Sequence, residues 1–358
     1  MDIIRNTRKM NDFGSALFDM YFGGMSFAAF DIETTGLAPD RCQIILAGFT
    51  SCSGGRCDTV QFFADDLSEE AELLEAVFAY IRRFDFLVTY NGRRFDTPFT
   101  LRRARHHRID THAYPYDFDI YPLAKRFSDI GSFVPNLRQK TLENFMGLWS
   151  SRTDEIDGGD SVRMYYDYMG CRGTAQGDWL KEKILLHNHD DVVQLYRLLS
   201  VTGRSDMHGA MNKLGFPVRT RAGIFCVDRA EVKRDHLLIS GKQPGWLYTD
   251  PKGRQGSAAG SIAGRAQAFA PLVYEDYGDG NAACSFRPDG TFTIEAALMQ
   301  QRGMMLADLT LLPAGAEHFE NLPTFGSGYL VLDSKMEINL LAQKMVESIV
   351  GSVIVQVR

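Results

Sequence analysis

Two acidic residues lie two positions apart in the apolar stretch Phe27–Leu37, which reads Phe-Ala-Ala-Phe-Asp-Ile-Glu-Thr-Thr-Gly-Leu. Alternate side chains of a β-strand share a face, so Asp31 and Glu33 are expected side by side at the end of a strand. Adjacent carboxylates repel each other, and an apolar strand does not favour the ionised form of either. A bound divalent cation would remove this conflict. The alternative is an edge strand whose acidic side chains are solvated.

Two later stretches carry further acidic residues beside expected helices. Asn91-Gly-Arg-Arg-Phe-Asp96 follows a short apolar strand and places Asp96 at the entrance of a helix, where Pro98 suits the first turn. His187-Asn-His-Asp-Asp191 lies within a long helix, in which His187 and Asp191 are four residues apart and therefore share a face. The fold has to bring these acidic stretches together if they act as one site.

In this order, the three stretches resemble the motifs of the DEDD 3′–5′ exonuclease superfamily, whose fold is RNase H-like. The residues that carry the resemblance are Phe30-Asp-Ile-Glu-Thr-Thr-Gly-Leu37, Tyr90-Asn-Gly-x-x-Phe-Asp96 and His187-Asn-x-x-Asp191, with softer agreement at Asp119-Ile-Tyr-Pro-Leu123 and Leu142-Glu-Asn-Phe-Met-Gly-Leu148. The match covers roughly residues 25–200. Within the superfamily, the chain is most similar to predicted bacterial ribonuclease H-like exonucleases akin to the proofreading domains of family B DNA polymerases.

The resemblance implies a role for each of four carboxylates. Asp31, Glu33, Asp96 and Asp191 would hold two Mg²⁺ or Mn²⁺ ions about 3.5–4 Å apart, one activating a water and the other stabilising the leaving 3′ oxygen. Asp31 is the implied bridging ligand, Glu33 and Asp191 complete the nucleophile side, and Asp96 would bind the second ion partly through water. Oxygen ligands suit Mg²⁺ or Mn²⁺ better than zinc.

The chain departs from the family pattern at His187. Its spacing from Asp191 is that of the branch that usually has tyrosine there, whereas the histidine branch has a longer gap. A histidine at this position could orient or deprotonate the attacking water, and the alternative is a helix histidine that only hydrogen-bonds a neighbour. Asp190 points about 100° away from Asp191 and is expected to be solvated, and His189 is expected on the polar surface.

Substrate contacts are expected around the same motifs. Leu37 and Phe95 resemble apolar positions that wedge against terminal bases in relatives, and Asn91 resembles a position that contacts the terminal nucleotide. Basic residues also gather around Asp96, at Arg93, Arg94, Arg102, Arg103, Arg105 and Arg108. Some could bind phosphates, while the alternative is a solvated helix face. The candidate substrate-binding set is Thr34, Leu37, Asn91, Phe95, Arg102 and Arg103.

The expected function is metal-dependent 3′–5′ exonuclease activity on DNA or RNA. One alternative is a structure-specific endonuclease of the same fold. Another is a nucleic-acid-binding module that has lost catalysis, although degenerate members usually lose one or more of the carboxylates and all four remain here. A third is an accessory nuclease subunit that needs a partner.

Residues 1–200 are expected to form an α/β domain, an RNase H-like mixed sheet with flanking helices. Apolar runs between turn residues predict strands, the first three as an antiparallel meander, over residues 26–33, 42–50, 57–63, 86–89 and 113–119. Apolar residues at helical spacing predict helices over residues 68–84, 120–127, 141–148, 162–169 and 179–199, and one that starts at Asp96. Residues 150–160 are expected to form a polar loop.

Residues 201–358 are expected to form a smaller β-rich domain of unknown role. Strand-like segments occupy residues 236–240, 271–277, 282–287, 291–296, 304–312 and 328–332, an exposed loop covers 253–264, and an amphipathic helix covers 334–350. One interpretation is a module for packing on the nuclease, for a homo-oligomer or for a nuclease partner. The other is a nucleic-acid platform built from Arg219, Arg221, Trp246, Tyr248, Arg254, Arg265 and Phe269.

The composition is that of an ordinary globular protein, and a polyanion would have to bind to a local patch of its surface. Residues 1–200 hold 23 Lys and Arg against 29 Asp and Glu, so a global positive field for nucleic acid is absent and a local basic patch with metal ions is needed instead. No stretch has the 18 or so consecutive apolar residues of a membrane span, and no secretory signal is expected. The six cysteines lack a Cys-x-x-Cys pair, which argues for a reducing cytoplasm. Cys52 and Cys57 could meet across a hairpin but are expected as two separate thiols.

Overall fold

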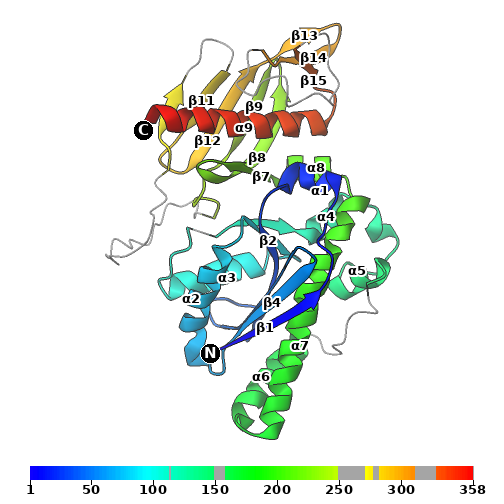
Figure 1. Ribbon diagram of the computed structural model, residues 1–358, viewed down its shortest axis with the longest axis vertical. Coiled ribbons are helices and arrows are strands. Elements are labelled where there is room, and N and C mark those ends of the chain that lie inside the picture. The colour runs from blue at the N-terminus through cyan, green and yellow to red at the C-terminus, as the bar shows by residue number, and fades with distance from the viewer. Residues whose placement is uncertain (113, 149–157, 249–270, 277–281, 311–327, 358) are drawn as a thin grey trace. The chain divides into compact units, whose positions relative to one another are not determined.

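The chain forms two compact units, Met1–Ser205 and Asp206–Arg358. The computed structural model describes residues 1–112, 114–148, 158–248, 271–276, 282–310 and 328–357 (Figure 1). The division falls after residue 205, where the sequence analysis placed it after residue 200. Each unit has its own sheet and its own buried apolar residues.

The first unit is built on a six-stranded mixed sheet with the strand order β1-β4-β3-β2-β5-β6. These strands are β1 (Asp2–Lys9), β2 (Phe27–Thr34), β3 (Ile44–Ser53), β4 (Arg56–Phe63), β5 (Phe86–Thr89) and β6 (Tyr116–Asp119). The first four in sequence pair antiparallel, whereas β5 and β6 continue the sheet in parallel from β2. The predicted meander and the predicted RNase H-like class of fold are confirmed.

Helices flank this sheet, and the long helix α7 runs along it (Figure 1). The α-helices are α1 (Ala16–Phe22), α2 (Glu70–Ile81), α3 (Asp96–His106), α4 (Ile120–Arg126), α5 (Gln139–Phe145), α6 (Gly158–Cys171) and α7 (Ala175–Arg197), with short 3₁₀ turns at η1 (Leu67–Glu69), η2 (Ile130–Ser132) and η4 (Leu198–Arg204). Contacts of α7 with β2, β3 and β4 place its residues over the centre of the sheet. Residues 150–157 of the expected polar loop lie outside the described residues. The remaining residues, 158–160, form the start of α6 and not a loop.

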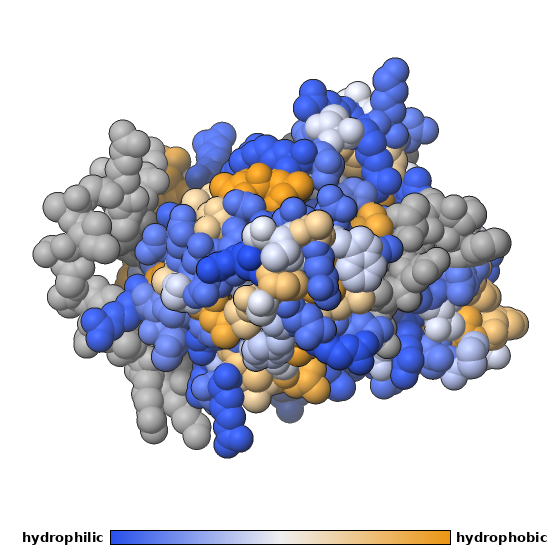
Figure 2. All heavy atoms as spheres, turned by 90° about the horizontal axis from the view of Figure 1, so that it is seen from below, coloured by the Kyte–Doolittle hydropathy of each residue, from blue (hydrophilic) through white to orange (hydrophobic). Residues whose placement is uncertain are grey.

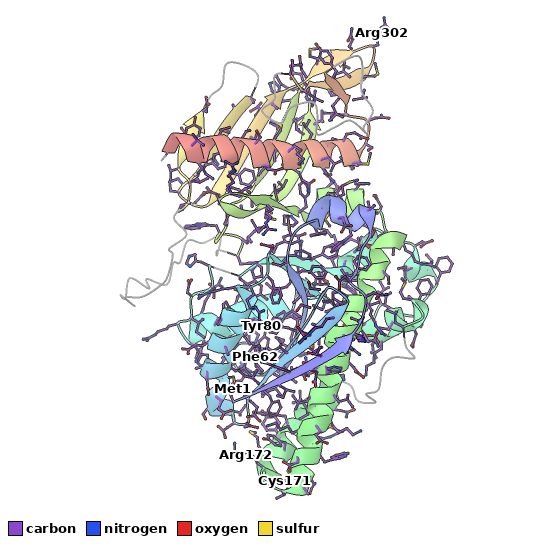
Figure 3. The ribbon with its side chains drawn as sticks, viewed as in Figure 1. Met1, Phe62, Tyr80, Cys171, Arg172 and Arg302 are labelled. Carbon is purple, nitrogen blue, oxygen red and sulfur yellow. A yellow bond between two sulfur atoms is a disulfide. The ribbon has the colours of Figure 1, made fainter. Side chains whose placement is uncertain are left out.

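Aromatic side chains fill the space between the sheet and its helices. Phe22 of α1 packs on Phe86 of β5, with ring centroids 4.6 Å apart. Phe62 of β4 and Tyr80 of α2 lie 5.6 Å apart, close together in Figure 3. Burying large rings of this kind contributes much of the apolar stabilisation of a domain core. The face seen in Figure 2 is mostly hydrophilic with scattered apolar side chains, as is usual for a globular surface.

β1 and α1 are not predicted from the sequence. β1 has little apolar alternation, and most of its residues are exposed. It forms because the antiparallel edge of β4 supplies backbone partners along its whole length, from Asp2 opposite Phe63 to Lys9 opposite Arg56. Alternation of apolar and polar residues does not predict strand pairing that depends mainly on backbone hydrogen bonds.

The prediction of two separate thiols is wrong, because Cys52 and Cys57 form a disulfide. The β3–β4 hairpin places the two residues directly opposite each other, with their Cα atoms 4.0 Å apart. Cross-strand pairs that face each other in an antiparallel hairpin bring their side chains together, and the tight turn at Gly54 and Gly55 sets this register.

The second unit contains a six-stranded antiparallel sheet with the order β10-β11-β12-β9-β8-β7 and a three-stranded sheet with the order β13-β14-β15. The strands are β7 (Phe216–Thr220), β8 (Gly223–Lys233), β9 (His236–Lys242), β10 (Tyr274–Asp276), β11 (Ala282–Phe286), β12 (Thr291–Ala297), β13 (Met299–Gln301), β14 (Met304–Asp308) and β15 (Tyr329–Val331). The predicted β-rich character is confirmed, but β7, β8 and β13 were missed. The expected loop 253–264 lies outside the described residues.

Two helices, α8 (Met207–Leu214) and α9 (Lys335–Val357), accompany these strands. α9 contacts α8, β7 and β8, and two buried asparagines join it to them: Asn212 Nδ2 donates to Ala230 O at 2.8 Å and to Asn339 Oδ1 at 3.1 Å. By length and composition, Lys335–Val355 could cross a membrane, but half of its most apolar stretch is buried inside the protein. This apolarity is that of a helix packed on a sheet.

Of the residues expected to form a nucleic-acid platform here, Arg219 and Arg221 are exposed, and Trp246 and Tyr248 are half-buried. Arg254, Arg265 and Phe269 lie outside the described residues.

Candidate metal centre

β2 carries the first two carboxylates in the middle of the sheet, between β3 and β5. Asp31 and Glu33 are two residues apart, so their side chains leave the strand on the same face. Glu33 is 7% exposed and Asp31 is half-buried. Pairing with β3 shifts between Glu33 and Thr34, and Thr34 Oγ1 then donates to Gly36 O at 2.8 Å. The strand therefore ends in a turn directly after the second acid.

The third carboxylate enters from the first turn of α3. Asp96 is 4% exposed, and its Oδ1 accepts a hydrogen bond from the backbone N–H of Ile32 at 3.3 Å. Ile32 lies between the two acids of β2, so this bond ties the second motif to the first. A helix N-terminus favours a negative charge, which suits an acid at this position.

A turn between β5 and α3 sets the position of Asp96. Asn91 has φ 61°, a left-handed conformation that asparagine adopts more readily than most residues. Its backbone N–H donates to Asp119 Oδ1 at 2.7 Å, and the same oxygen accepts from the backbone N–H of Tyr121 at 3.0 Å. Asp119 thus joins the turn to the start of α4, a role that the sequence analysis did not assign to it.

α7 brings the last motif over the sheet. His187 is 3% exposed, and its Nε2 lies 3.5 Å from Glu33 Oε1 and 3.4 Å from Asp191 Oδ2. Ligand atoms of Glu33, His187 and Asp191 all lie within 4.8 Å of one another, close enough to share one metal ion. Two stretches separated by more than 150 residues in sequence therefore meet here.

The negative charges act on one another most strongly at Asp31. Burial raises its pKa well above the ordinary value, and the charges of Asp96, Asp191 and Glu33 raise it further. A hydrogen bond from Asn188 opposes this rise only in part. Burial, followed by the charge of Asp117, raises the pKa of Asp96 to about 8. The other three predicted carboxylates thus lie within electrostatic reach of Asp31.

This donor set fits a hard divalent cation. Carboxylate oxygens are preferred ligands of Mg²⁺ and Mn²⁺, and the raised carboxyl pKa values show that ionising the group costs free energy when no cation is bound. His187 adds an imidazole nitrogen, which Mn²⁺ accepts more readily than Mg²⁺. Asp31, Glu33, Asp96 and Asp191 are the residues that would hold such ions, with His187 beside Glu33 and Asp191.

The expectation for Asp190 is wrong. Its side chain is 4% exposed rather than solvated, and its Oδ1 lies 3.2 Å from Nδ1 of the half-buried His189. Arg8 of the unpredicted strand β1 is close enough for its charge to interact with that of Asp190. Burial and the charge of Arg197 lower the pKa of Arg8, while the charge of Asp190 opposes that change.

The apolar candidates for substrate contact lie at the ends of the elements that carry the acids. Leu37 follows β2 and is 85% exposed, which is unusual for a leucine. Phe95 directly precedes Asp96, is half-buried and packs against Phe99 with ring centroids 5.4 Å apart. Thr34, through its hydroxyl, and Asn91, through its backbone N–H, both form hydrogen bonds that stabilise their turns. Contact of any of these residues with a nucleotide stays a prediction.

The two arginine candidates differ sharply. Arg102 is 59% exposed and donates to Asp40 Oδ1 at 2.7 Å. Arg103 is 5% exposed, forms a two-pronged ion pair with the buried Glu70, and donates to Pro39 O at 3.1 Å. A guanidinium in this setting stabilises the fold and is not presented to a phosphate, so the expectation that Arg103 binds substrate does not fit the structure.

Comparison with known proteins finds a family model and two DNA polymerases that are similar to part of this chain. Residues 28–202 match the family model described as the RNase H superfamily. A DNA polymerase of Methanocaldococcus jannaschii is 32% identical over 90 residues, which is 23% of this chain and 6% of the polymerase. The family B DNA polymerase of Pyrobaculum calidifontis has 17% identity and a TM-score of 0.38, over 51% of this chain and 27% of the polymerase. The chain thus spans a small part of each polymerase. Residues 28–202 are therefore similar in sequence to the RNase H superfamily, and the mixed sheet of the first unit has the corresponding class of fold.

Proposed function

We propose that this protein is a metal-dependent 3′–5′ exonuclease that hydrolyses phosphodiester bonds of DNA or RNA. The observation that supports the proposal is a cluster of acidic groups in the region that matches the RNase H superfamily. Ligand atoms of Glu33, His187 and Asp191 lie within 4.8 Å of one another, and the charges of Asp96, Asp191 and Glu33 all act on Asp31. Buried like charges are costly unless a cation or a proton offsets them. A site that needs a cation and faces a polyanionic substrate is suited to phosphoryl chemistry.

The four carboxylates would hold two Mg²⁺ or Mn²⁺ ions. When bound, such ions supply Lewis acidity and lower the pKa of a bound water. The protein contributes the fixed positions of the carboxylates: β2 sets two of them, the first turn of α3 sets the third and α7 sets the fourth.

His187 is the residue proposed to handle a proton. Its Nε2 faces both Glu33 and Asp191, so a water near these carboxylates would lie within reach of the imidazole. A neutral histidine can accept a proton from such a water and release it afterwards. The carboxylates beside it would stabilise the imidazolium.

Exposed side chains around the site would orient the polynucleotide. Leu37 offers an apolar surface for a terminal base beside Asp31 and Glu33, with Phe95 close to Asp96. Arg102 is exposed on α3 and would contribute a salt-dependent contact to a phosphate. These contacts are weaker in sequence specificity than base-edge hydrogen bonds, which suits an enzyme that removes successive nucleotides.

Matched oligonucleotides test the proposal. Single-stranded DNA and RNA of one sequence, labelled at the 5′ end, are incubated with the full chain and Mg²⁺ or Mn²⁺, and with EDTA as the metal-free control. Progressive shortening from the 3′ end that EDTA and Asp31→Asn both abolish is the expected result. Circular single-stranded DNA separates the alternatives, because an exonuclease leaves it intact and an endonuclease opens it. Failure to cut any of these polymers with either ion would refute nuclease activity.

A further inference from the structure

Three residues lie abreast on neighbouring strands beside the metal centre. Asp31 of β2 is opposite Gly48 of β3, and Gly48 is opposite Gln61 of β4. The middle position has no side chain, and the buried side chain of Asn188 from α7 takes its place. A Cβ atom on Gly48 would lie 2.0 Å from Asn188 Oδ1 and 2.9 Å from its Cγ. The backbone of Gly48 is not left-handed, so glycine is required here for space.

Asn188 connects Asp31 and Gln61, the cross-strand neighbours of Gly48 on β2 and β4. Its Nδ2 donates to Asp31 Oδ2 at 3.1 Å, and its Oδ1 accepts from Gln61 Nε2 at 3.0 Å. Asn188 and Gln61 are 0% and 1% exposed, so water does not compete with these bonds. Buried amides in such a chain hold their partners more firmly than exposed ones.

A backbone carbonyl sets the direction of the chain. Gln61 Nε2 also donates to Leu185 O at 2.8 Å. A carbonyl oxygen can only accept, so Gln61 has to turn its NH₂ group toward α7. Asn188 must then turn its own oxygen toward Gln61, which leaves its NH₂ group facing Asp31.

We propose that Gly48, Gln61 and Asn188 form a positioning unit that holds the Asp31 carboxylate ready for a divalent cation. The inference rests on the proposed function of the same site. A neutral amide suits this task because it orients the carboxylate without cancelling its charge, whereas Lys or Arg would compete with the cation. None of the three residues has to touch the substrate, since each acts through Asp31. Partners that orient metal ligands typically change metal affinity or activity by about 10–100-fold.

The test measures Mn²⁺ binding by electron paramagnetic resonance on the full chain, with no nucleic acid present. Asn188→Ala removes the donor, Gly48→Ala displaces it with a methyl group, and Gln61→Leu removes the group that orients it. Each variant is expected to weaken Mn²⁺ binding by about 10–100-fold. The same variants should lower kcat more than they raise KM, because the substrate contacts remain.

The chain supplies a matched control on the same strands. Thr59 of β4 lies two residues from Gln61 and therefore on the same face, and its Oγ1 shares a hydrogen bond of 3.1 Å with Oγ1 of Thr50 on β3. Both threonines are buried. Thr59→Val removes a buried interstrand hydrogen bond without touching Asp31, and should leave Mn²⁺ affinity at the wild-type value.

A double variant separates positioning from packing. Gly48→Ala alone creates a clash and Asn188→Ala alone creates a cavity, so each should lower the melting temperature. Combined, the added methyl enters the vacated space, and the melting temperature should recover part of the loss. Mn²⁺ affinity should stay as low as in Asn188→Ala, because the donor to Asp31 is still missing.

The outcomes distinguish this proposal from the one on which it rests. Wild-type Mn²⁺ affinity in Asn188→Ala, or its return in the double variant, overturns the positioning unit and leaves the nuclease proposal in place. If the variants bind Mn²⁺ more weakly as expected but the wild-type protein cuts no polymer, the positioning unit is supported and the nuclease proposal is rejected. If the wild-type chain binds no Mn²⁺, both proposals fall.

Discussion

His187 Nε2 lies 3.4 Å from Asp191 Oδ2 and almost as close to Glu33. If the imidazole handles the proton of the attacking water, His187→Gln should lower kcat by about 10²–10⁴-fold while leaving KM nearly unchanged. The measurement is steady-state hydrolysis of a labelled oligonucleotide at saturating Mn²⁺. His189→Gln, two residues away on the same helix, is the control and should retain activity. Equal losses in both variants would contradict the assigned role.

The carboxylates should behave as a group, distinct from other acids of α7. Asp191→Asn and Glu33→Gln should each lower activity by more than the roughly 100-fold that a supporting partner costs, because each removes an oxygen of the metal centre. Asp178 lies in the exposed first turn of the same helix, so Asp178→Asn should be neutral. Circular dichroism and Mn²⁺ titration of each variant separate loss of the site from loss of the fold.

Stability of the metal-free protein should fall as the pH rises. Burial and neighbouring negative charges raise the pKa of Asp31, that of Asp96 to about 8 and that of Asp119 to about 7. Between about pH 4 and these values, the native state keeps protons that the unfolded state has released, so the free energy of unfolding decreases with pH. In EDTA, the melting temperature should therefore be lower at about pH 8 than at about pH 5.

A divalent cation should reverse this trend, since it stabilises the ionised carboxylates. Mn²⁺ is expected to raise the melting temperature more at the higher pH, and Asp96→Asn should flatten the metal-free profile. Differential scanning fluorimetry across this range gives the comparison. A metal-free melting temperature that rises with pH would show that the buried carboxylates are already ionised and compensated.

Mutation of the neighbouring arginines Arg102 and Arg103 of α3 should lower the free energy of unfolding by very different amounts. Arg103→Ala leaves Glu70 buried without its main partner and should cost about 3–5 kcal/mol of unfolding free energy. Burial opposes the charge on Glu70, but hydrogen bonds from Arg103, His107 and Ile44 outweigh it and lower the pKa of this carboxyl. Arg102→Ala removes only an exposed pair with Asp40 and should cost about 0–1 kcal/mol.

Urea denaturation measures these losses. Nucleic-acid binding at increasing salt supplies the complementary readout: if Arg102 contacts a phosphate, its removal should reduce the salt dependence of binding. A stability loss in Arg102→Ala that equals that of Arg103→Ala would show that exposure does not separate the two roles.

The second unit should depend on its buried asparagine pair. Asn339 Nδ2 donates to His208 O at 2.9 Å, and Asn339 is fully buried. Asn339→Ala leaves that carbonyl without this donor and should lower the free energy of unfolding by about 1–3 kcal/mol. Thermal unfolding gives the loss, and unchanged Mn²⁺ affinity would show that the effect is confined to this unit.

Apolar runs and apolar periodicity in the sequence predicted the elements that contribute most to the core of the first unit. The meander of β2, β3 and β4 and the helices α2, α3 and α7 follow from apolar spacing and turn residues. These patterns failed for β1, β7 and β8, for different reasons. β1 has almost no apolar pattern and depends on the edge of β4. β7 is short and buries three consecutive residues rather than alternate ones, and the pairing of β8 with β9 is interrupted by a bulge between Val227 and Arg229.

The sequence by itself predicted which residues would form a metal centre. Spacing places Asp31 beside Glu33 and His187 beside Asp191, and the resemblance of the three motifs to one superfamily adds Asp96. Only the tertiary structure decided how their neighbours are used. It buried Arg103 against Glu70, buried the side chain of Asp190, and placed Asn188 over Gly48 between Asp31 and Gln61. The physical reason is that these contacts join residues far apart in the chain, and local patterns of apolar and polar residues carry no information about which distant side chain will share a buried space.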